Sequence, residues 1–518
     1  MPRDRAARGV PRRLGSSSLA EDARLHARGP LTGTPEEPAA EGVGARAASG
    51  AVLLGARGLV VYTLGIGANL LLARLLDPRD FGVVALGTVV VVMSTYLSTG
   101  GLSAALIQRE RPPERRELEA VQGLQLAVTG AVAVIVAAVC APLGTEALVV
   151  ATMVAAVPLT MLRTPSVVVL ERDLRYRVIA TADLVEAMTY YVWSVGTVLL
   201  GWGVWGMATA VVARAAAGSA VAVGYAPMGF VRPRWSWPDV RPLFAFGAKF
   251  QAATLLQIGR EQAVAVAVAA VAGLSTLGVW NLAWRVIQVP LLLFQTVGRV
   301  AFPALSRMMD AGRDPRAAIE RAAAGLAALT AVVTVALVAL APALPSVVGR
   351  GWEDVPDVLV WAGVALLTNA PTVVVAGGYL YAADDAGAVA TATLLSAIVW
   401  VGLASALLPA LDAPAVGIGW VAGGLLNAAL LRRRTTARTG AALLRSIGPP
   451  TCVGLVALAA AALVARAIDD ALLGAAAGLA AGEALALAGL AVAARPALGD
   501  LLALGGQSVR ALGRPGAA

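Results

Sequence analysis

The chain is poor in histidine, in cysteine and in charge. Its one histidine is His26, and its two cysteines, Cys140 and Cys452, lie inside apolar segments. A histidine-based metal site and histidine acid–base catalysis are therefore excluded from the apolar part of the chain. Two cysteines in such segments do not form a disulfide framework. We expect neither a metal nor a cofactor.

Charged residues make up 14% of the chain and hydrophobic residues 58%, whereas a soluble domain is about 25% charged. Apolar segments recur from about residue 50 to residue 494, and each has roughly the 20 residues that cross a bilayer as a helix. We predict an all-α polytopic membrane protein with about 14 transmembrane helices. They are expected at 50–73, 82–106, 120–142, 146–170, 178–200, 204–226, 248–271, 277–298, 322–346, 355–380, 388–410, 414–431, 446–466 and 470–494.

The connections between these segments are short, and none could hold a soluble catalytic domain of about 100 residues. Residues 1–49 are rich in Arg, Gly, Pro, Ser and Glu and contain no apolar run. This composition predicts a disordered cytoplasmic tail. The alternative is that translation starts further along the chain. A second cytoplasmic tail is expected at 495–518.

Basic residues, nearly all of them Arg, gather in alternate loops. An even number of spans puts both termini on one side of the membrane. On that side the tail 1–49 carries eight Arg, and basic loops follow at 107–119, 171–177, 227–249, 299–321 and 432–445. On the other side we find only Arg74, Arg79, Arg350 and Arg466. Because basic loops mark the cytoplasmic face, both termini are predicted to be cytoplasmic. The alternation argues against a nucleic-acid partner.

Two segments six spans apart resemble each other. Residues 77–86 read DPRDFGVVAL, and residues 273–282 read GLSTLGVWNL. An even spacing of spans gives both halves the same orientation, as in transporters built from parallel repeats. The alternative is chance similarity in a chain rich in Ala, Val and Leu. The predicted organisation is a six-helix lobe at 50–226, a cytoplasmic linker at 227–247, a second six-helix lobe at 248–434 and two extra transmembrane helices at 446–494.

Five segments carry a resemblance to a known family. They are ARLLDPRDFG at 73–82, GLSAALIQR at 101–109, LERDLRYR at 170–177, WNLAWR at 280–285 and FPALSR at 302–307. In this order they resemble the polysaccharide-type flippases of the multidrug/oligosaccharidyl-lipid/polysaccharide exporter superfamily. Beyond about residue 320 the resemblance rests on hydropathy and on the number of spans.

The resemblance implies a non-enzymatic flippase of the bacterial cytoplasmic membrane. It would move undecaprenyl-diphosphate-linked oligosaccharides by alternating access for cell-surface polysaccharide biosynthesis. Membrane lipid, a polysaccharide polymerase and glycosyltransferases are its candidate partners. The chain departs from the family in its seventh helix, where Gln257, Arg260, Glu261 and Gln262 replace a polar cluster with an Asp. It also departs after the tenth helix, where a basic loop is replaced by Asp384 and Asp385.

Charged residues inside the predicted spans are the candidates for function, because a charge in the hydrocarbon costs about 2.5 kcal/mol or more and must face the interior or a cavity. Arginine binds phosphate through a planar fork of donors. The candidates for binding the diphosphate are Arg57, Arg163, Arg214, Arg260 and Arg285. The candidates for a coupling ion or proton site are Asp183, Glu186 and Glu261, while Glu483 is expected to have a packing role.

Each of these residues also has a structural interpretation. Arg57, Asp183 and Arg163 could extend to the membrane interface. Asp183 and Glu186 share a helix face and could pair with arginines. Arg285 could pair with an acid and hold two helices together.

Three other functions remain open. A drug exporter of the same superfamily would favour acidic and aromatic cavity residues over Arg. A polytopic glycosyltransferase, polymerase or ligase would need an outer catalytic loop, and the longest outer loop offers only Glu353, Asp354 and Asp357. A scaffold would recruit partners through the tail.

Overall fold

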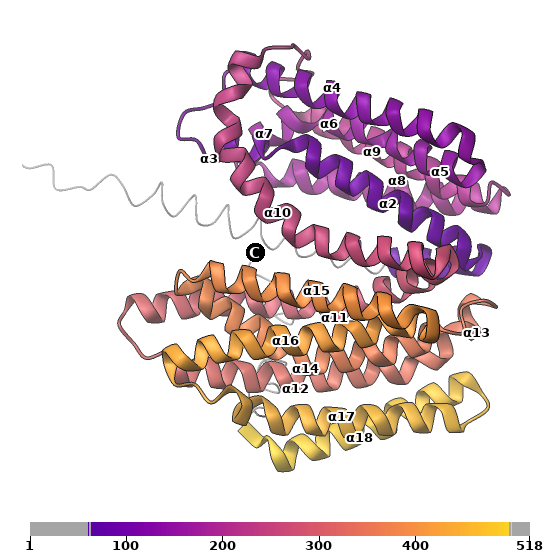
Figure 1. Cartoon of the computed structure of the whole chain (residues 1–518), viewed down its shortest axis with the longest axis vertical. Helices are drawn as coiled ribbons and strands as arrows, with labels where there is room; N and C mark the ends of the chain where they lie inside the picture. The colour runs from indigo at the N-terminus through magenta and orange to yellow at the C-terminus, as the bar shows by residue number, and fades with distance from the viewer. Residues whose placement is uncertain (1–60, 62–63, 497–498, 500–518) are drawn as a thin grey trace, which may run out of the picture. The chain divides into compact units, whose positions relative to one another are not determined.

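The computed structural model of the protein describes residue 61, residues 64–496 and residue 499. Within this range only the backbone is described for residues 245–246, 248–250, 252–253, 256–257, 295–304 and 310. The predicted tail 1–49, Arg57 and most of the predicted tail 495–518 lie outside the described residues. All regular secondary structure in the described part is helical (Figure 1), which confirms the predicted all-α class.

The chain runs through a series of mostly long helices joined by short connections. They are Leu64–Leu75, α2 (Pro78–Thr99), α3 (Leu102–Gln108), α4 (Arg115–Cys140), α5 (Thr145–Val154), α6 (Ala156–Met161), α7 (Thr164–Arg172), α8 (Tyr176–Leu199), α9 (Val204–Tyr225), α10 (Trp237–Val271), α11 (Gly273–Asp310), α12 (Arg316–Leu340), α13 (Leu344–Val348), α14 (Val355–Ala382), α15 (Ala386–Leu411), α16 (Pro414–Thr439), α17 (Leu443–Ala467) and α18 (Ala471–Ala493). Short 3-10 turns at Ala141–Leu143 and Ala341–Ala343 extend α4 and α12.

Each predicted span overlaps one of these helices or a broken set of them. By length and composition, ten helices of the described part could cross a membrane, and a bent pair would raise the number to eleven. Leu64–Leu75, α8 and α10 correspond to the three other predicted spans. The chain is a multi-pass membrane protein, and the count of 14 spans stays a prediction.

The fourth predicted span is broken. Its two parts, Thr145–Met161 and Thr164–Arg172, are bent by 46°. Arg163 stands at the break, and Pro165 follows it in the first turn of α7. Proline removes a backbone donor and clashes with the preceding turn, so the helix cannot continue straight through this position.

Several helices run beyond the apolar segments that identified them. Within the predicted linker 227–247, α10 already begins at Trp237, so the second half of this stretch is helical. The basic stretch that was predicted as the loop 432–445 is also mostly helical, since α16 continues to Thr439. Hydropathy marks only the part of a helix that lies in hydrocarbon, whereas backbone hydrogen bonding continues into the aqueous layer.

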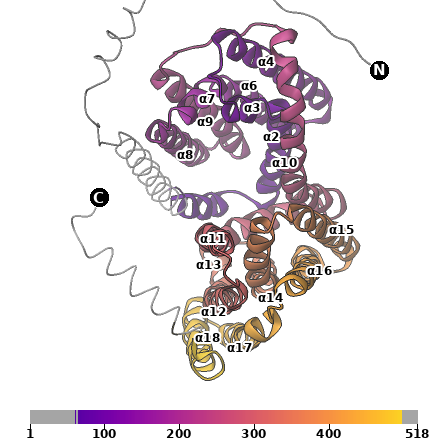
Figure 2. The same cartoon turned by 90° about the vertical axis from the view of Figure 1, so that its left-hand side faces the viewer.

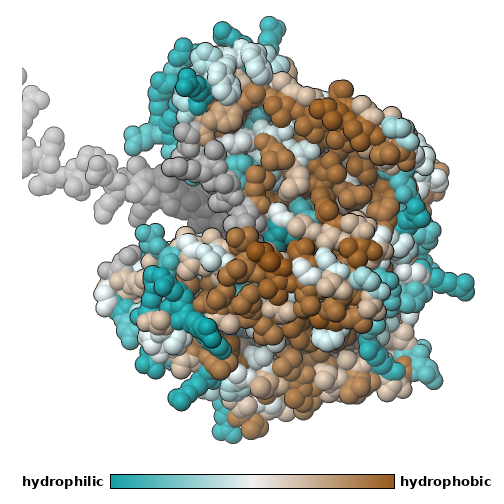
Figure 3. All heavy atoms as spheres, in the orientation of Figure 1, coloured by the Kyte–Doolittle hydropathy of each residue, from teal (hydrophilic) through white to brown (hydrophobic). Residues whose placement is uncertain are grey.

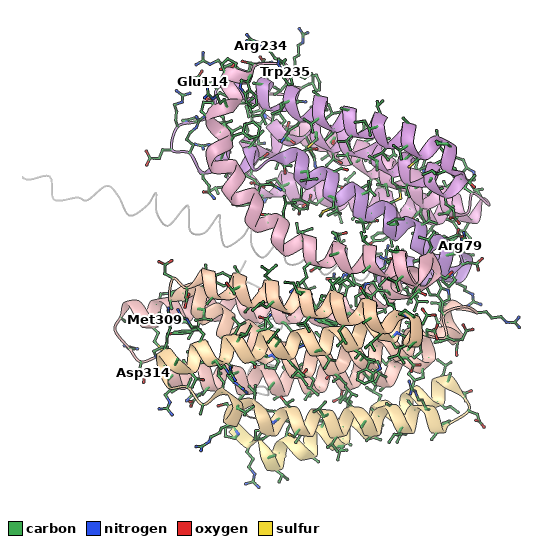
Figure 4. All side chains as sticks on the ribbon, viewed as in Figure 1. Arg79, Glu114, Arg234, Trp235, Met309 and Asp314 are labelled. Carbon is green, nitrogen blue, oxygen red and sulfur yellow. The ribbon has the colours of Figure 1, made fainter. Side chains whose placement is uncertain are left out.

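Ion pairs and hydrogen bonds join neighbouring helix ends at both ends of the helices. At one end Arg79 donates to Glu146 at 2.6 Å and Arg466 pairs with Asp357. At the other end Arg172 donates to backbone oxygens near Arg109, and Arg434 pairs with Asp385. Figure 4 shows Arg79 at one end of the helices and Glu114, Arg234, Met309 and Asp314 at the other. This separation is what strictly alternating spans require.

Apolar side chains cover the flanks of the helices. In Figure 3 hydrophobic residues extend across the middle of the face shown, and hydrophilic residues gather toward its margins. Exposed Val134, Leu199 and Val492 are examples from three different helices. In water such a surface would be an aggregation liability, but in a bilayer it is the surface that lipid contacts.

Helices α2 to α9 pack on one another, and so do α11, α12 and α14 to α16. The last two helices, α17 and α18, pair with each other and lie on α12 (Figure 2). Helix α10 contacts α2, α3 and α4 on one side and α11 and α15 on the other. We keep the predicted lobes 50–226 and 248–434 as a proposal, with α10 shared between the two groups of helices.

Candidate functional site

Helices α2 and α11 cross at two glycines with almost no space between their backbones. A Cβ atom on Gly82 would overlap the carbonyl oxygen of Leu274, and a Cβ atom on Gly278 would overlap that of Pro78. Each glycine thus meets the residue that lies four positions before the other glycine. This reciprocal contact is pseudo-symmetric, as expected of two copies of a repeat, and it supports the repeat interpretation of 77–86 and 273–282 over chance similarity.

Further contacts close the same end of the molecule. The indole N–H of Trp352 donates to the carbonyl of Ala73 at 2.9 Å, and its ring meets Phe81 edge-on, with 5.1 Å between the centroids. Thr276 donates to Asp412 at 2.5 Å. Trp352 is fully buried. We call these contacts, together with the glycine crossing, the α2–α11 seal.

A cavity of about 150 Å³ lies directly beside the seal. Its walls come from four helices, namely α2, α10, α11 and α15. The lining residues are Ala85, Thr88, Val89, Glu261, Gln262, Val264, Ala265, Leu277, Trp280, Asn281, Trp284 and Trp400. One wall is therefore aromatic, another is small and nearly apolar, and α10 and α11 add carboxylate and amide groups.

The aromatic wall belongs to a cluster of four tryptophans on three helices, which we call the tryptophan cluster. Trp280 and Trp284 are neighbours one turn apart on α11, with ring centroids 5.5 Å apart. Trp400 of α15 lies 6.3 Å from Trp280 and stacks on Trp420 of α16 at 5.6 Å. Trp420 also lies 5.7 Å from Trp284, so the four rings form a closed circuit.

Arg260 lies beside this cluster. Its guanidinium carbon is 5.7 Å from the centroid of the Trp400 ring, a cation–π contact. Its nearest acid is Glu261, at 3.8 Å, which is too long for a hydrogen bond. The Nε–H of Arg260 is buried and has no hydrogen-bond partner among the described residues. A buried guanidinium donor without an acceptor is costly, so this position favours an incoming anion.

Arg285 lies one turn beyond Asn281 on α11. Its Nε donates to the Asn281 side chain at 3.0 Å, and one terminal nitrogen donates to Asn69, on Leu64–Leu75. The guanidinium also lies 5.9 Å from the centre of the Phe81 ring. No acid pairs with Arg285 among the described residues, so the predicted alternative of an ion pair that fixes helix packing is not what is found. Neutral amides hold it, and its charge stays uncompensated.

The remaining predicted residues lie in other surroundings. Arg163 donates to Glu186 at 2.5 Å, and Gly218 on α9 leaves room for this pair. Arg214 lies over the Tyr190 ring at 5.2 Å. Asp183 is on α8, one turn before Glu186. Glu483 lies on α18, away from the cavity-lining helices. Arg260, Glu261 and Arg285 thus lie close to the cavity, whereas Arg163 and Glu186 pair with each other.

Sequence reasoning missed the tryptophan cluster and Asn69. Trp280 and Trp284 were visible as a pair spaced by one helical turn within a family-like motif. Trp400 and Trp420 lie on different helices and share no local pattern with that pair, so only their packing identifies them. Among the described residues no group of three or more His, Cys, Asp or Glu could hold a metal ion.

Comparison with known proteins identifies a family and a fold. The family model described as "Polysaccharide biosynthesis protein" matches residues 71–357, which is more than half of the chain. A search of curated proteins finds no significant sequence match. Among solved structures, the chain is similar to the lipid II flippase MurJ in an inward closed conformation, with a TM-score of 0.64 at 12% identity. The match covers 85% of this chain and 98% of that one.

A second similar structure is the inward-facing conformation of a multidrug resistance MATE family transporter of the MOP superfamily. Its TM-score is 0.57 at 15% identity, over 74% of this chain and 96% of that one. At these identities both matches establish the fold. One of these proteins is a flippase and the other a transporter.

Proposed function

The chain belongs to the polysaccharide biosynthesis protein family, and from this premise we propose that it flips undecaprenyl-diphosphate-linked oligosaccharides across the bacterial cytoplasmic membrane. The flippase fold of the superfamily is the established part. The cargo, the membrane and the direction of transport are the proposal.

The observation that carries the proposal is that neither of the two arginines beside the cavity is hydrogen-bonded to an acid among the described residues. Arg260 keeps a buried Nε donor without a partner, and Arg285 is held only by amides. A lipid diphosphate brings at least two negative charges and several acceptor oxygens. Arginine matches such oxygens with two parallel donors. The attraction is strong where water is excluded, because the effective dielectric constant is low there.

The α2–α11 seal supports transport by alternating access. If both termini are cytoplasmic, as the Arg distribution predicts, the seal lies at the outer end of the helices. A cargo in the cavity could then leave outward only after α2 and α11 separate. Backbone contacts at Gly82 and Gly278 can open without rearranging long side chains, which suits a surface that must part and close again.

The other sequence candidates keep roles within this proposal. Arg214, which lies over the Tyr190 ring and has no ion pair among the described residues, is a second contact for the diphosphate along its path. Glu261 is the best-placed coupling group, because it lines the cavity next to Arg260. Arg163, Asp183 and Glu186 are further candidates on the first group of helices. A polysaccharide polymerase and glycosyltransferases remain the proposed partners.

A transport assay tests the cargo. Purified protein is placed in vesicles with an undecaprenyl-diphosphate-linked sugar, and appearance of the sugar on the far side is followed with a membrane-impermeant glycosidase. Arg260→Gln and Arg285→Gln should each slow transport by about 10-fold or more, since each removes charge-assisted hydrogen bonds of about 1–3 kcal/mol. Arg260→Lys should recover only part, because a point charge lacks the fork geometry.

The matched control is Arg313→Gln, which removes an exposed arginine from the loop after α11 and should leave the rate unchanged. Native rates in both Arg260→Gln and Arg285→Gln would remove the arginines from the cargo site.

One observation favours a second function. The cavity combines tryptophans with Glu261, and this combination suits a lipophilic organic cation. The same vesicles are therefore loaded with ethidium. Ethidium transport that is lost in Glu261→Gln and kept in Arg260→Gln would support the drug exporter over the flippase.

A further inference from the structure

The tryptophan cluster has features that a packing core does not need. Trp280 and Trp400 are only 6% and 2% exposed, so they do not belong to an aromatic belt at the membrane interface. A closed apolar core would surround such rings with aliphatic side chains on all sides. Here the cluster instead borders a cavity whose walls also include Glu261, Gln262 and Asn281.

The four rings have different surroundings. Trp400 is stacked on Trp420, carries Arg260 against its ring and donates its N–H to the carbonyl of Val416 at 3.0 Å. These three contacts hold Trp400 in place, although it also lines the cavity, so it acts as a support. Trp284 is partly exposed, lines the cavity, and its indole N–H donates to no described residue. Trp284 therefore offers both a ring surface and an unused donor to an occupant of the cavity.

A sugar ring fits this combination of groups. One face of a pyranose presents C–H groups, which pack by dispersion and apolar contact on an aromatic surface. Its rim presents hydroxyls, which both donate and accept hydrogen bonds. The amides of Gln262 and Asn281 can do the same, and the carboxylate of Glu261 can accept. A cavity of about 150 Å³ has the volume of about five water molecules at roughly 30 Å³ each, which suits one sugar ring rather than a whole oligosaccharide.

The neighbouring arginines indicate which sugar of the cargo this would be. Arg260 contacts Trp400 directly, and Arg285 follows Trp284 in the sequence and donates to Asn281 one helical turn earlier on α11. The sugar closest to a diphosphate bound by these arginines is the one attached to it. The small residues Ala85 and Thr88 on α2 leave the opposite wall free for that ring.

We propose that the tryptophan cluster is a stacking subsite for the first sugar of the lipid-linked glycan, with Trp284 as the contacting ring. This inference rests on the proposed function, because the sugar arrives joined to the diphosphate. The protein would therefore recognise two parts of the cargo. The arginines bind the diphosphate, and the tryptophan stacks on the adjoining sugar.

Lipid-binding measurements on the full-length protein in nanodiscs distinguish recognition of the diphosphate from recognition of the sugar. The probes are undecaprenyl diphosphate, undecaprenyl diphosphoglucose and phosphatidylglycerol. The native protein should bind the glucose-bearing lipid about 10-fold more tightly than undecaprenyl diphosphate, which corresponds to about 1.4 kcal/mol. Trp284→Leu should abolish this preference and leave the affinity for undecaprenyl diphosphate unchanged. Arg260→Gln should weaken both affinities and keep the preference.

Two further variants guard against loss of the fold. Thr88→Leu fills the cavity from α2, leaves every tryptophan in place, and should also abolish the preference for glucose. Trp361→Leu is the matched control, since Trp361 is a partly exposed tryptophan of α14 outside the cluster, and it should bind like the native protein.

A native protein that binds the two undecaprenyl lipids equally would overturn the subsite while leaving the flippase proposal standing. An equal loss of both affinities in Trp284→Leu and Thr88→Leu would do the same. If neither undecaprenyl lipid bound better than phosphatidylglycerol, the proposed function itself would fail, and the subsite with it.

Discussion

Two Arg–Glu pairs inside this membrane protein have the same composition and opposite geometry. Arg163 and Glu186 come from different helical segments, lie 2.5 Å apart and are each about one-fifth exposed. Arg260 and Glu261 are adjacent in sequence, yet their charged atoms are 3.8 Å apart and Arg260 keeps an unused buried donor. The first pair satisfies itself, whereas the second lies beside a cavity. Proximity in sequence is thus a poor guide to which charges neutralise each other.

The largest effect on stability is expected when the satisfied pair is broken. Glu186→Gln leaves Arg163 partly buried without its counter-charge, and removal of one partner of a buried pair costs about 3–5 kcal/mol. Because the pair is about one-fifth exposed, we expect about 2–3 kcal/mol. The thermal unfolding midpoint in detergent should fall by several degrees. The double variant Arg163→Met/Glu186→Leu should recover most of the loss, and a midpoint unchanged in Glu186→Gln would show that the pair is not structural.

A smaller effect is expected at the cavity, where the substitution should change ligand binding rather than stability. Glu261→Gln should leave the unfolding midpoint nearly native, because Glu261 makes no hydrogen bond with Arg260. It should tighten binding of undecaprenyl diphosphate by about 3- to 10-fold, since it removes a negative charge that competes with the ligand for Arg260. Weaker binding in Glu261→Gln would mean that the carboxylate helps to hold the cargo. The contrast between the two pairs would then be wrong.

The smallest effect is expected at Asp385, which pairs with two more exposed arginines at the helix ends and sets the baseline for the other two. The carboxylate of Asp385, in the turn between α14 and α15, forms ion pairs with Arg434 and Arg438, with N–O distances of 2.8 Å and 2.7 Å. The hydrogen bond from Arg434 is the main cause that lowers the pKa of the Asp385 carboxyl below its ordinary value, and the charges of Arg434 and Arg438 add to it. A lowered pKa contributes stability above the ordinary aspartate range, and that contribution is lost as the pH falls through the folded-state pKa.

Asp385→Asn should therefore shift the unfolding midpoint very little at pH 7, because water screens ion pairs to exposed arginines. Any difference from the native protein should begin to shrink below the ordinary aspartate pKa of about 3.9 and vanish once the pH is below the lower folded-state pKa of Asp385. A shift at pH 7 as large as that of Glu186→Gln would remove the distinction between the pair inside the membrane and the ion pairs at the helix ends.

The same contrast separates what could be predicted from what could not. Arg260 and Arg285 were predicted as binding residues because charge inside a span is costly, and each contacts a residue that lines the cavity, Trp400 and Asn281 respectively. Arg163 was predicted on the same ground, but it is paired with Glu186, which was itself predicted for coupling. No local pattern distinguishes these cases, since the partner of Arg163 lies 23 residues away on another helix.

For the repeat, by contrast, a local sequence pattern did indicate residues that meet in the structure. Gly82 and Gly278 were equivalent in two short segments that chance could also have produced. Their reciprocal contact gives the similarity a physical reason: at a crossing this close neither helix has room for a Cβ atom. The departure after the tenth helix also has an explanation, because the acidic Asp385 is met by basic residues of α16.

The sequence by itself determined the class of the protein and the approximate positions of its helices. These properties follow from hydropathy, helical length and loop composition, which are local sums over the chain. The tertiary structure alone decided which arginines are hydrogen-bonded to an acid, where the cavity lies and that four tryptophans from three helices meet beside it. Those properties depend on which faces of distant helices contact each other. In hydrocarbon that choice comes from close packing and polar pairing rather than from hydropathy, because almost every face is apolar.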